Sequence, residues 1–152
     1  MVAGSLRGLT HVPRADFYLI DKPRFREQPL LLVCELAKRG YAANLATLVL
    51  ARDAAQAEEL DDLLWSFDPD EYLPHQIAGT DDGEDETPIL IATPDADTAA
   101  RPLLINLRDA APVGAFERVL EVVPADPAAR APLRERWKHY QALGFDVTKH
   151  DM

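Results

Sequence analysis

Cysteine, long apolar runs and a leader-like N-terminus are scarce or missing in this sequence. The 152 residues contain one cysteine, Cys34, so no disulfide can form within the chain. No apolar run approaches the roughly 20 residues that a membrane-spanning helix needs. The first residues, MVAGSLRGLTHVPR, lack the apolar core of a secretory signal. The sequence therefore predicts a cytoplasmic protein in a reducing environment, without a membrane contact.

The motifs of nucleotide, metal and hydrolase chemistry are absent as well. The seven glycines form neither GxGxxG nor GxxxxGK[ST], the turns whose backbone approaches a phosphate. The four histidines have no HExxH or CxxC companion, and there is no Gly-x-Ser-x-Gly elbow. Cys34 falls on the apolar stripe of an expected helix, where a small core residue is expected. The sequence thus predicts no catalytic residue, no cofactor and no metal site.

Basic residues are fewer than acidic residues in this chain. The chain has 16 Lys and Arg against 26 Asp and Glu, which gives a net charge of -10. A field of this sign works against binding to a nucleic-acid backbone. Four of the basic residues nevertheless fall within nine positions, from Arg130 to Lys138. A local basic strip on an acidic protein suits a short acidic partner.

Short apolar runs alternate with amphipathic segments along the chain. Strands are predicted at 17–21, 46–51, 88–92, 102–107 and 119–124, and helices at 29–39, 53–65, 115–118 and 130–145. Gly40 is expected to end the first helix, and Asp53 with Gln56 forms a capping-box pattern at the second. This order predicts a flexible extension over 1–15 and a single-domain α/β fold over 16–152, with a mostly parallel sheet flanked by helices.

The last predicted helix is the segment that most resembles a binding site. Its basic side consists of Arg130, Arg134, Lys138 and Gln141, and its apolar stripe of Leu133, Trp137 and Tyr140. A solvated basic side and a binding surface both fit this pattern. Asp126 and Pro127 suit the start of the helix, while Pro132 implies either an irregular first turn or a regular helix from about Ala131.

Residues 66–79 form a Pro-broken segment that is unusually aromatic for a loop. Trp65, Tyr72 and Pro74 lie in or beside it. Two interpretations remain open: these side chains fold back over the sheet, or they form a surface for a partner. The acidic run TDDGEDET at 80–87 is interpreted as a solvated turn, because its spacing does not match the twelve-residue calcium loop.

Several segments together resemble a known family. They are FYLID, LVCELA, LW followed by YLPHQIAG, ILIA with LLINL, and VVP followed by LRERWKHYQALGF. In this order, over about residues 16–145, they are similar to the chi subunit of bacterial DNA polymerase III. The N-terminal extension, the acidic run and the final DVTKHDM lie outside the shared pattern. The resemblance implies a mononucleotide-binding-like topology without a phosphate loop, and no enzymatic activity of the chain itself.

The resemblance also implies partners. Such a chain is similar to an adaptor that links the clamp-loader complex, through the psi subunit, to the acidic C-terminal tail of single-strand-DNA-binding protein during DNA replication. That tail ends in an aromatic residue with a free carboxylate, and DNA is bound only indirectly. The residues implied for tail binding are Val123, Arg130, Arg134, Trp137, Lys138 and Phe145. Those implied for psi, or another clamp-loader component, are Trp65, Tyr72 and Pro74.

Two other function classes remain open. A small enzyme would need a cleft assembled from separated acids and His75, marked by strongly shifted pKa values. A generic regulator would dimerise through Trp65 and Tyr72. The adaptor hypothesis instead predicts a monomer, or a heterodimer with its partner.

Overall fold

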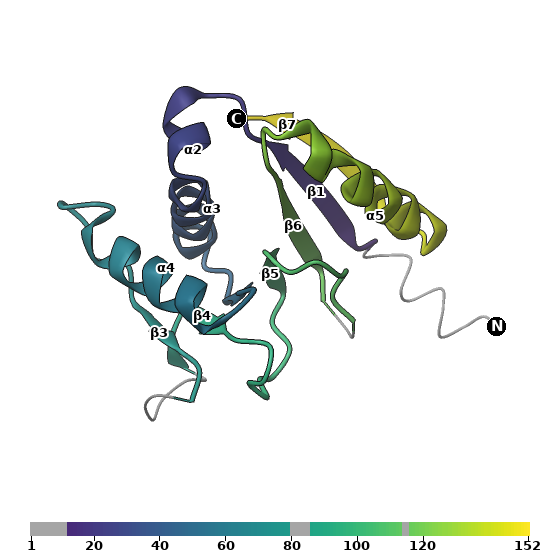
Figure 1. Ribbon diagram of the computed structural model, residues 1–152. Coiled ribbons are helices and arrows are strands. Elements are labelled where there is room, and N and C mark those ends of the chain that lie inside the picture. The colour runs from purple at the N-terminus through teal and green to yellow at the C-terminus, as the bar shows by residue number, and fades with distance from the viewer. Residues whose placement is uncertain (1–11, 80–85, 114–115) are drawn as a thin grey trace.

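The computed structural model of the protein describes residues 12–79, 86–113 and 116–152, whose strands form one sheet (Figure 1). The seven strands are β1 (Arg14–Leu19), β2 (Thr47–Leu50), β3 (His75–Ile77), β4 (Ile89–Ala92), β5 (Leu103–Asn106), β6 (Arg118–Val123) and β7 (Asp146–Asp151). Their order in the sheet is β3-β4-β2-β5-β6-β1-β7, and every neighbouring pair is parallel. The predicted α/β fold with a parallel sheet is confirmed.

The central strands are mostly apolar and are buried along their whole length. All four residues are buried in each of β2, β4 and β5. Because both faces of such a sheet are covered, its strands lack the polar alternation of a half-exposed strand. The continuous apolar runs predicted as strands at 46–51, 88–92 and 102–107 are therefore confirmed, each with slightly shorter bounds.

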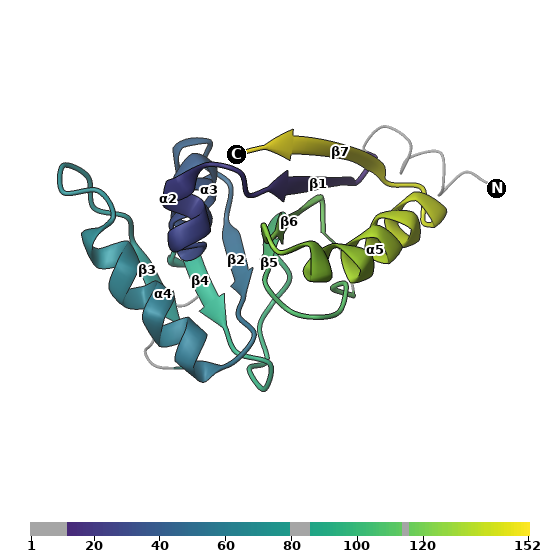
Figure 2. The ribbon, with the colours of Figure 1, turned by 45° about the horizontal axis from the view of Figure 1, so that its top comes forward.

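Helices cover the two faces of the sheet unequally (Figure 2). On one face lie α2 (Pro23–Glu27), α3 (Leu30–Ala42) and α4 (Ala54–Ser66), and on the other lies α5 (Arg130–Ala142). Cys34 is fully buried on the first face, as predicted, and burial raises the pKa of its thiol to about 12. The second face matters more for function, because only part of it is covered by a helix.

The capping pattern predicted for α4 is confirmed. The carboxylate of Asp53 accepts a hydrogen bond of 2.8 Å from the backbone N–H of Gln56. The side-chain oxygen of Gln56 in turn accepts a bond of 2.7 Å from the N–H of Arg52. These contacts satisfy backbone donors that have no partner within the helix.

Helix α5 begins in two stages. Asp126 accepts a hydrogen bond from the N–H of Ala128 and caps a single 3-10 turn at Pro127–Ala129. Regular α-helix then starts at Arg130 and has Pro132 in its first turn, where the missing N–H costs no helical hydrogen bond. Of the two alternatives that Pro132 implies, regular helix from about Ala131 agrees to within one residue, and the 3-10 turn precedes it.

Two predicted details are wrong. Gly40 does not end α3, which continues to Ala42, but lies buried where the helix meets the sheet. A Cβ at this position would lie 2.8 Å from side-chain atoms of both Leu103 and Thr47. The helix predicted at 115–118 is contradicted at Arg118, which begins β6 and donates its N–H to the Pro102 carbonyl beside β5. Pairing with β5 therefore determines the structure at Arg118. Residues 114–115, which include the start of the predicted helix, lie outside the described residues.

Three short elements are not predicted by the sequence: α2, β3 and β7. β3 and β7 are the two edges of the sheet, where strands need not be apolar and charged residues limit unwanted pairing. β1 begins at Arg14, three residues before the predicted strand, so Arg14 and Ala15 of the predicted extension belong to it. Residues 1–11 of that extension, and 80–85 of the acidic run, lie outside the described residues.

Candidate functional site

A groove lies between α5 and the carboxyl ends of β1 and β6. Its volume is about 560 Å³, and we call it the α5 groove. Its lining residues are Phe17, Leu19, Val123, Arg130, Leu133, Arg134, Trp137, Lys138, Gln141 and Lys149. Five of the six residues predicted for tail binding are among them: Val123, Arg130, Arg134, Trp137 and Lys138. The fold therefore brings the end of β6 and one side of α5 together at one groove.

The floor of the α5 groove is apolar. Phe17 and Leu19 alternate along β1 and so point to the same face, and Val123 stands beside Leu19 in the sheet. The ring of Trp137 packs on Phe17, with ring centroids 5.0 Å apart. A large apolar side chain of a ligand that lost its contact with water on this floor would be stabilised by about 1.5–3 kcal/mol.

One wall of the groove carries three cations. Arg130, Arg134 and Lys138 follow each other at intervals of four residues, so they lie along one side of α5. Lys138 approaches Glu135 at 3.8 Å, but both side chains are at least 70 % exposed, and such pairs contribute little stability. Within the part of the chain that the structure describes, Arg134 has no ion pair. Both side chains are thus available to an acidic ligand.

Arg130 holds a buried donor without an acceptor. Its Nε has almost no contact with water and no hydrogen-bond partner among the described residues. A buried donor left in this state costs about 1–3 kcal/mol. A carboxylate is the acceptor whose geometry best matches a guanidinium. The guanidinium of Arg130 therefore keeps hydrogen-bonding capacity that the described residues leave unused.

The other side of α5 is anchored to the sheet through Glu121, a fully buried residue of β6. Arg136 donates to Oε1 of Glu121 at 2.8 Å, while Tyr140 and Asn106 donate to Oε2 at 2.6 and 3.0 Å. Burial raises the pKa of Glu121, and the charge of Arg136 and the three hydrogen bonds offset part of that rise. Because Arg136 and Tyr140 both belong to α5, these bonds set the rotation of the helix and hence the side that faces the groove.

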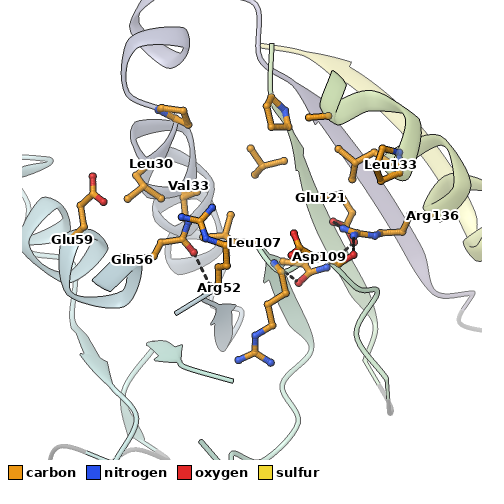
Figure 3. A pocket seen from close by; sticks show the side chains of 17 residues that line it. Leu30, Val33, Arg52, Gln56, Glu59, Leu107, Asp109, Glu121, Leu133 and Arg136 are labelled. Carbon is orange, nitrogen blue, oxygen red and sulfur yellow. Dashed lines mark hydrogen bonds and ion pairs between the residues drawn. The ribbon is translucent and has the colours of Figure 1, made fainter. Parts of the chain in front are cut away.

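A second cavity, of about 540 Å³, lies on the Glu121 side of α5 (Figure 3). Open α/β sheets commonly bind ligands at this edge, where the strands end. Here Arg108 donates to the carbonyl oxygens of Ala51 and Ala92 at 2.9 Å each and so caps the ends of β2 and β4. Glu121 faces the cavity with a side chain only 1 % exposed, and both its oxygens accept bonds within the protein. The side chains of Arg108 and Glu121 at this cavity are therefore already bonded within the protein.

A second surface consists of Trp65, near the end of α4, and Tyr72, just before β3; we call it the aromatic pair. Their rings stack with centroids 5.4 Å apart, although the residues are 60 % and 59 % exposed. Pro74 is half-buried beside them, and the preceding Leu73 is buried in the core. The pair does not fold back over the sheet, so its rings are open to a partner.

His75, which an enzymatic cleft would require, is enclosed instead. Its ring lies edge-on to Trp65 at 4.8 Å. Its nitrogens contact the carbonyl oxygens of Leu73 and Asp61 at 2.6 and 3.2 Å, and its side chain has no exposed surface. His75 therefore lies enclosed in the protein and supports the loop beneath the aromatic pair.

Sequence reasoning misses part of the groove and misplaces one residue. Phe145 does not line it, because its ring packs on Phe116 and Tyr140, with centroids 5.6 and 5.2 Å away. Phe17 and Leu19, which form the floor, are not predicted. Their alternation in FYLID indicates a shared face of a strand, but only the chain crossover decides that α5 covers that face.

The groove helix and the aromatic pair lie in a segment that matches one known family. The sequence pattern of the family described as "DNA polymerase III chi subunit, HolC" matches residues 12–148. The chain belongs to this family. It is 34 % identical over 141 residues to DNA polymerase III subunit chi of Pseudomonas aeruginosa, which covers 90 % of this chain and 95 % of the relative. The Escherichia coli protein of the same name is 31 % identical over 139 residues, with 88 % and 94 % covered.

The Haemophilus influenzae subunit chi is also 31 % identical, over 124 residues that cover 80 % of this chain and 85 % of the relative. As a chi-family chain, the protein is an accessory subunit of DNA polymerase III, and the predicted role in DNA replication is confirmed. Among the described residues, no group of three or more His, Cys, Asp or Glu could hold a metal ion. No helix in the same residues is long and apolar enough to cross a membrane.

Proposed function

We propose that this chi-family chain is a non-catalytic adaptor that links the clamp loader to the acidic C-terminal tail of single-strand-DNA-binding protein. The tail binds in the α5 groove. The psi subunit, or another clamp-loader component, binds the aromatic pair. The two contacts use different surfaces of one chain, so both partners can be held at once.

The observation that carries the proposal is the pairing of an apolar floor with an adjacent wall of cations in the α5 groove. The tail offers matching chemistry, because its last residue is aromatic and ends in a free carboxylate. The aromatic side chain would lie on Phe17 and Val123, beside Trp137. The terminal carboxylate would accept hydrogen bonds from the guanidinium groups of Arg130 and Arg134. Lys138 lies on the same wall and would add to its attraction for the terminal carboxylate.

The charge of the whole chain supports a protein partner rather than DNA. With a net charge of -10, the chain repels a phosphate backbone at long range. The same field would repel an acidic peptide, but the groove cations act at hydrogen-bond distance, where screening by salt is weaker. Contact with DNA is therefore indirect and passes through the bound partner.

The aromatic pair supports the second contact. Exposed, stacked aromatic rings are rare on a free surface and common at the centre of protein interfaces. Trp65 and Tyr72 are held in place by buried neighbours, so little ordering entropy is lost when a partner covers them. The proposal expects a monomer that forms a heterodimer with its partner, and a cytoplasmic location.

The test of tail binding is a titration of a fluorescent peptide that copies the tail of the cognate single-strand-binding protein. Wild type is expected to bind saturably and more weakly as salt rises. Arg134→Ala is expected to weaken binding by at least about tenfold, or roughly 1.4 kcal/mol. Arg39→Ala, which removes an exposed cation from α3 on the opposite face, is the matched control and should leave the affinity unchanged.

A second control separates the terminal carboxylate from the rest of the peptide. The same peptide with a C-terminal amide should bind wild type weakly and should no longer distinguish wild type from Arg134→Ala. If wild type does not bind the free-acid peptide, or if Arg39→Ala is as harmful as Arg134→Ala, the groove is not the tail site.

A further inference from the structure

Lys149 reaches the α5 groove from β7, one residue beyond the end of the family-matched segment. The match ends at residue 148, and Lys149 follows it on β7 at the edge of the sheet. In the register between β1 and β7, Lys149 stands directly beside Phe17 on the groove floor. It is exposed and lines the groove from β7. The groove is thus lined by cations from two elements, α5 and β7.

The neighbours of Lys149 hold the strand so that its side chain faces the groove. Thr148 and His150 both donate hydrogen bonds to the buried carboxylate of Asp16 on the opposite face of the sheet. The ring of His150 also stacks on Tyr18, with centroids 4.6 Å apart. Because successive side chains of a strand alternate between faces, Lys149 is directed to the groove. Its position is therefore a consequence of the way β7 docks.

Lys149 has no counter-charge among the residues that the structure describes. In the described ranges it takes part in no ion pair, and the acid that follows on the same face, Asp151, does not line the groove. A lysine that is held at a groove edge without a carboxylate partner suits an anionic group of a ligand.

We propose that Lys149 binds an acidic side chain of the tail, upstream of its C-terminal residue, while the α5 cations hold the terminal carboxylate. This inference rests on the proposed tail-binding function. An extended peptide rises about 3.3 Å per residue, so a tail whose last side chain covers the floor must continue toward one edge of the groove. The α5 side is occupied by Arg130, Arg134 and Lys138, and the β7 side offers Lys149. The tail therefore crosses the floor from α5 to β7.

The test is a double-mutant cycle between Lys149 and the charge of the peptide. Two peptides are compared, the acidic tail and a version whose acidic side chains are replaced by their amides, both with a free terminal carboxylate. Lys149→Ala should lower the affinity for the acidic peptide by about threefold, and Lys149→Glu should lower it by about tenfold. For the amide peptide, Lys149→Ala should change the affinity by less than about 1.5-fold. Lys149→Arg should retain binding, and Arg39→Ala is again the charge-matched control.

The outcomes separate this inference from the function on which it rests. If Arg134→Ala abolishes binding while Lys149→Ala changes nothing, the tail leaves the groove elsewhere and the role of Lys149 is overturned. If Lys149→Ala lowers the affinity for both peptides equally, the lysine contributes to packing and does not bind the acidic side chains. Failure of wild type to bind either peptide overturns both proposals. Unchanged thermal unfolding of Lys149→Ala would show that any loss of affinity is not a loss of fold.

Discussion

The hydroxyl of Tyr140 donates a hydrogen bond of 2.6 Å to Oε2 of Glu121, and both residues are almost completely buried. Tyr140 belongs to α5 and Glu121 to β6, so this bond ties the helix that carries the groove cations to the sheet. Arg136, one turn earlier on α5, pairs with the other oxygen of the same carboxylate. Two attachments one turn apart hold α5 in a single rotation.

Replacing Tyr140 with Phe removes one donor from a buried carboxylate and leaves the ring in place. We expect the free energy of unfolding at pH 7 to fall by about 1–2 kcal/mol, because Oε2 of Glu121 keeps only Asn106. Urea denaturation measures this loss. Tyr41→Phe, at a half-buried tyrosine whose hydroxyl has no hydrogen bond among the described residues, should cost less than about 0.5 kcal/mol. Equal losses in the two variants would mean that the Tyr140 hydroxyl adds nothing.

Asp16 makes the docking of β7 sensitive to acid. Burial alone would raise the pKa of this carboxyl, but hydrogen bonds from Thr148, His150 and Arg118 outweigh burial and lower it. Because the folded pKa lies below the unfolded one, the contribution of Asp16 to stability is complete above about pH 3.9. That contribution is lost as the pH falls through the folded pKa.

Asp16→Asn should therefore lower stability at pH 7 by about 3 kcal/mol, because Arg118 loses a buried partner. Its free energy of unfolding should also change less between about pH 5 and pH 2 than that of wild type. Denaturant titrations across this range provide the measurement. Asp21→Asn, at an exposed acid that pairs loosely with Arg26 at 3.4 Å, should keep the wild-type slope. Parallel curves for wild type and Asp16→Asn would contradict the assignment.

Gly40→Ala should destabilise the protein although alanine is the better helix former. The new Cβ would lie 2.8 Å from Leu103 Cδ2 and from Thr47 Oγ1 in a packed interior. We expect a loss of about 1–3 kcal/mol from overpacking, against a gain of about 1 kcal/mol from helix propensity. In a Leu103→Val background, which shortens the obstructing side chain, the same change should cost less. A cost that is the same in both backgrounds would exclude the contact with Leu103 as the cause.

Trp65→Ala tests the aromatic pair against the dimer hypothesis. Because Trp65 is mostly exposed, its removal should change the free energy of unfolding by less than about 1 kcal/mol. Binding to the clamp-loader partner should fall by at least about tenfold, while tail affinity stays the same. Leu143→Ala, at another residue that is 60 % exposed, is the control. Sedimentation should show wild type as a monomer; a wild-type dimer that Trp65→Ala dissociates would favour the regulator instead.

The sequence predicts the fold well where burial leaves a local signal. Continuous apolar runs identify β2, β4 and β5, and the pattern of Asp53 with Gln56 identifies the start of α4. The sequence predicts the local structure poorly where contacts with residues far away in the chain determine it. Gly40 has the sequence pattern of a helix end, but in the fold it is a close contact between α3 and side chains of β2 and β5. The sequence of β7 is too polar to predict a strand, and β7 forms by pairing with β1.

The candidate site divides in the same way. The stripe of Arg130, Arg134 and Lys138 needs only the period of one helix, and the family is recognisable from local segments. The floor residue Phe17, the cation Lys149 and the distance of Phe145 from the groove depend on tertiary structure. Phe17 and Lys149 become neighbours because the parallel order of the sheet inserts β1 between β6 and β7. The sequence by itself determined the chemistry of the groove helix, and only the folded sheet decided which distant side chains complete the groove.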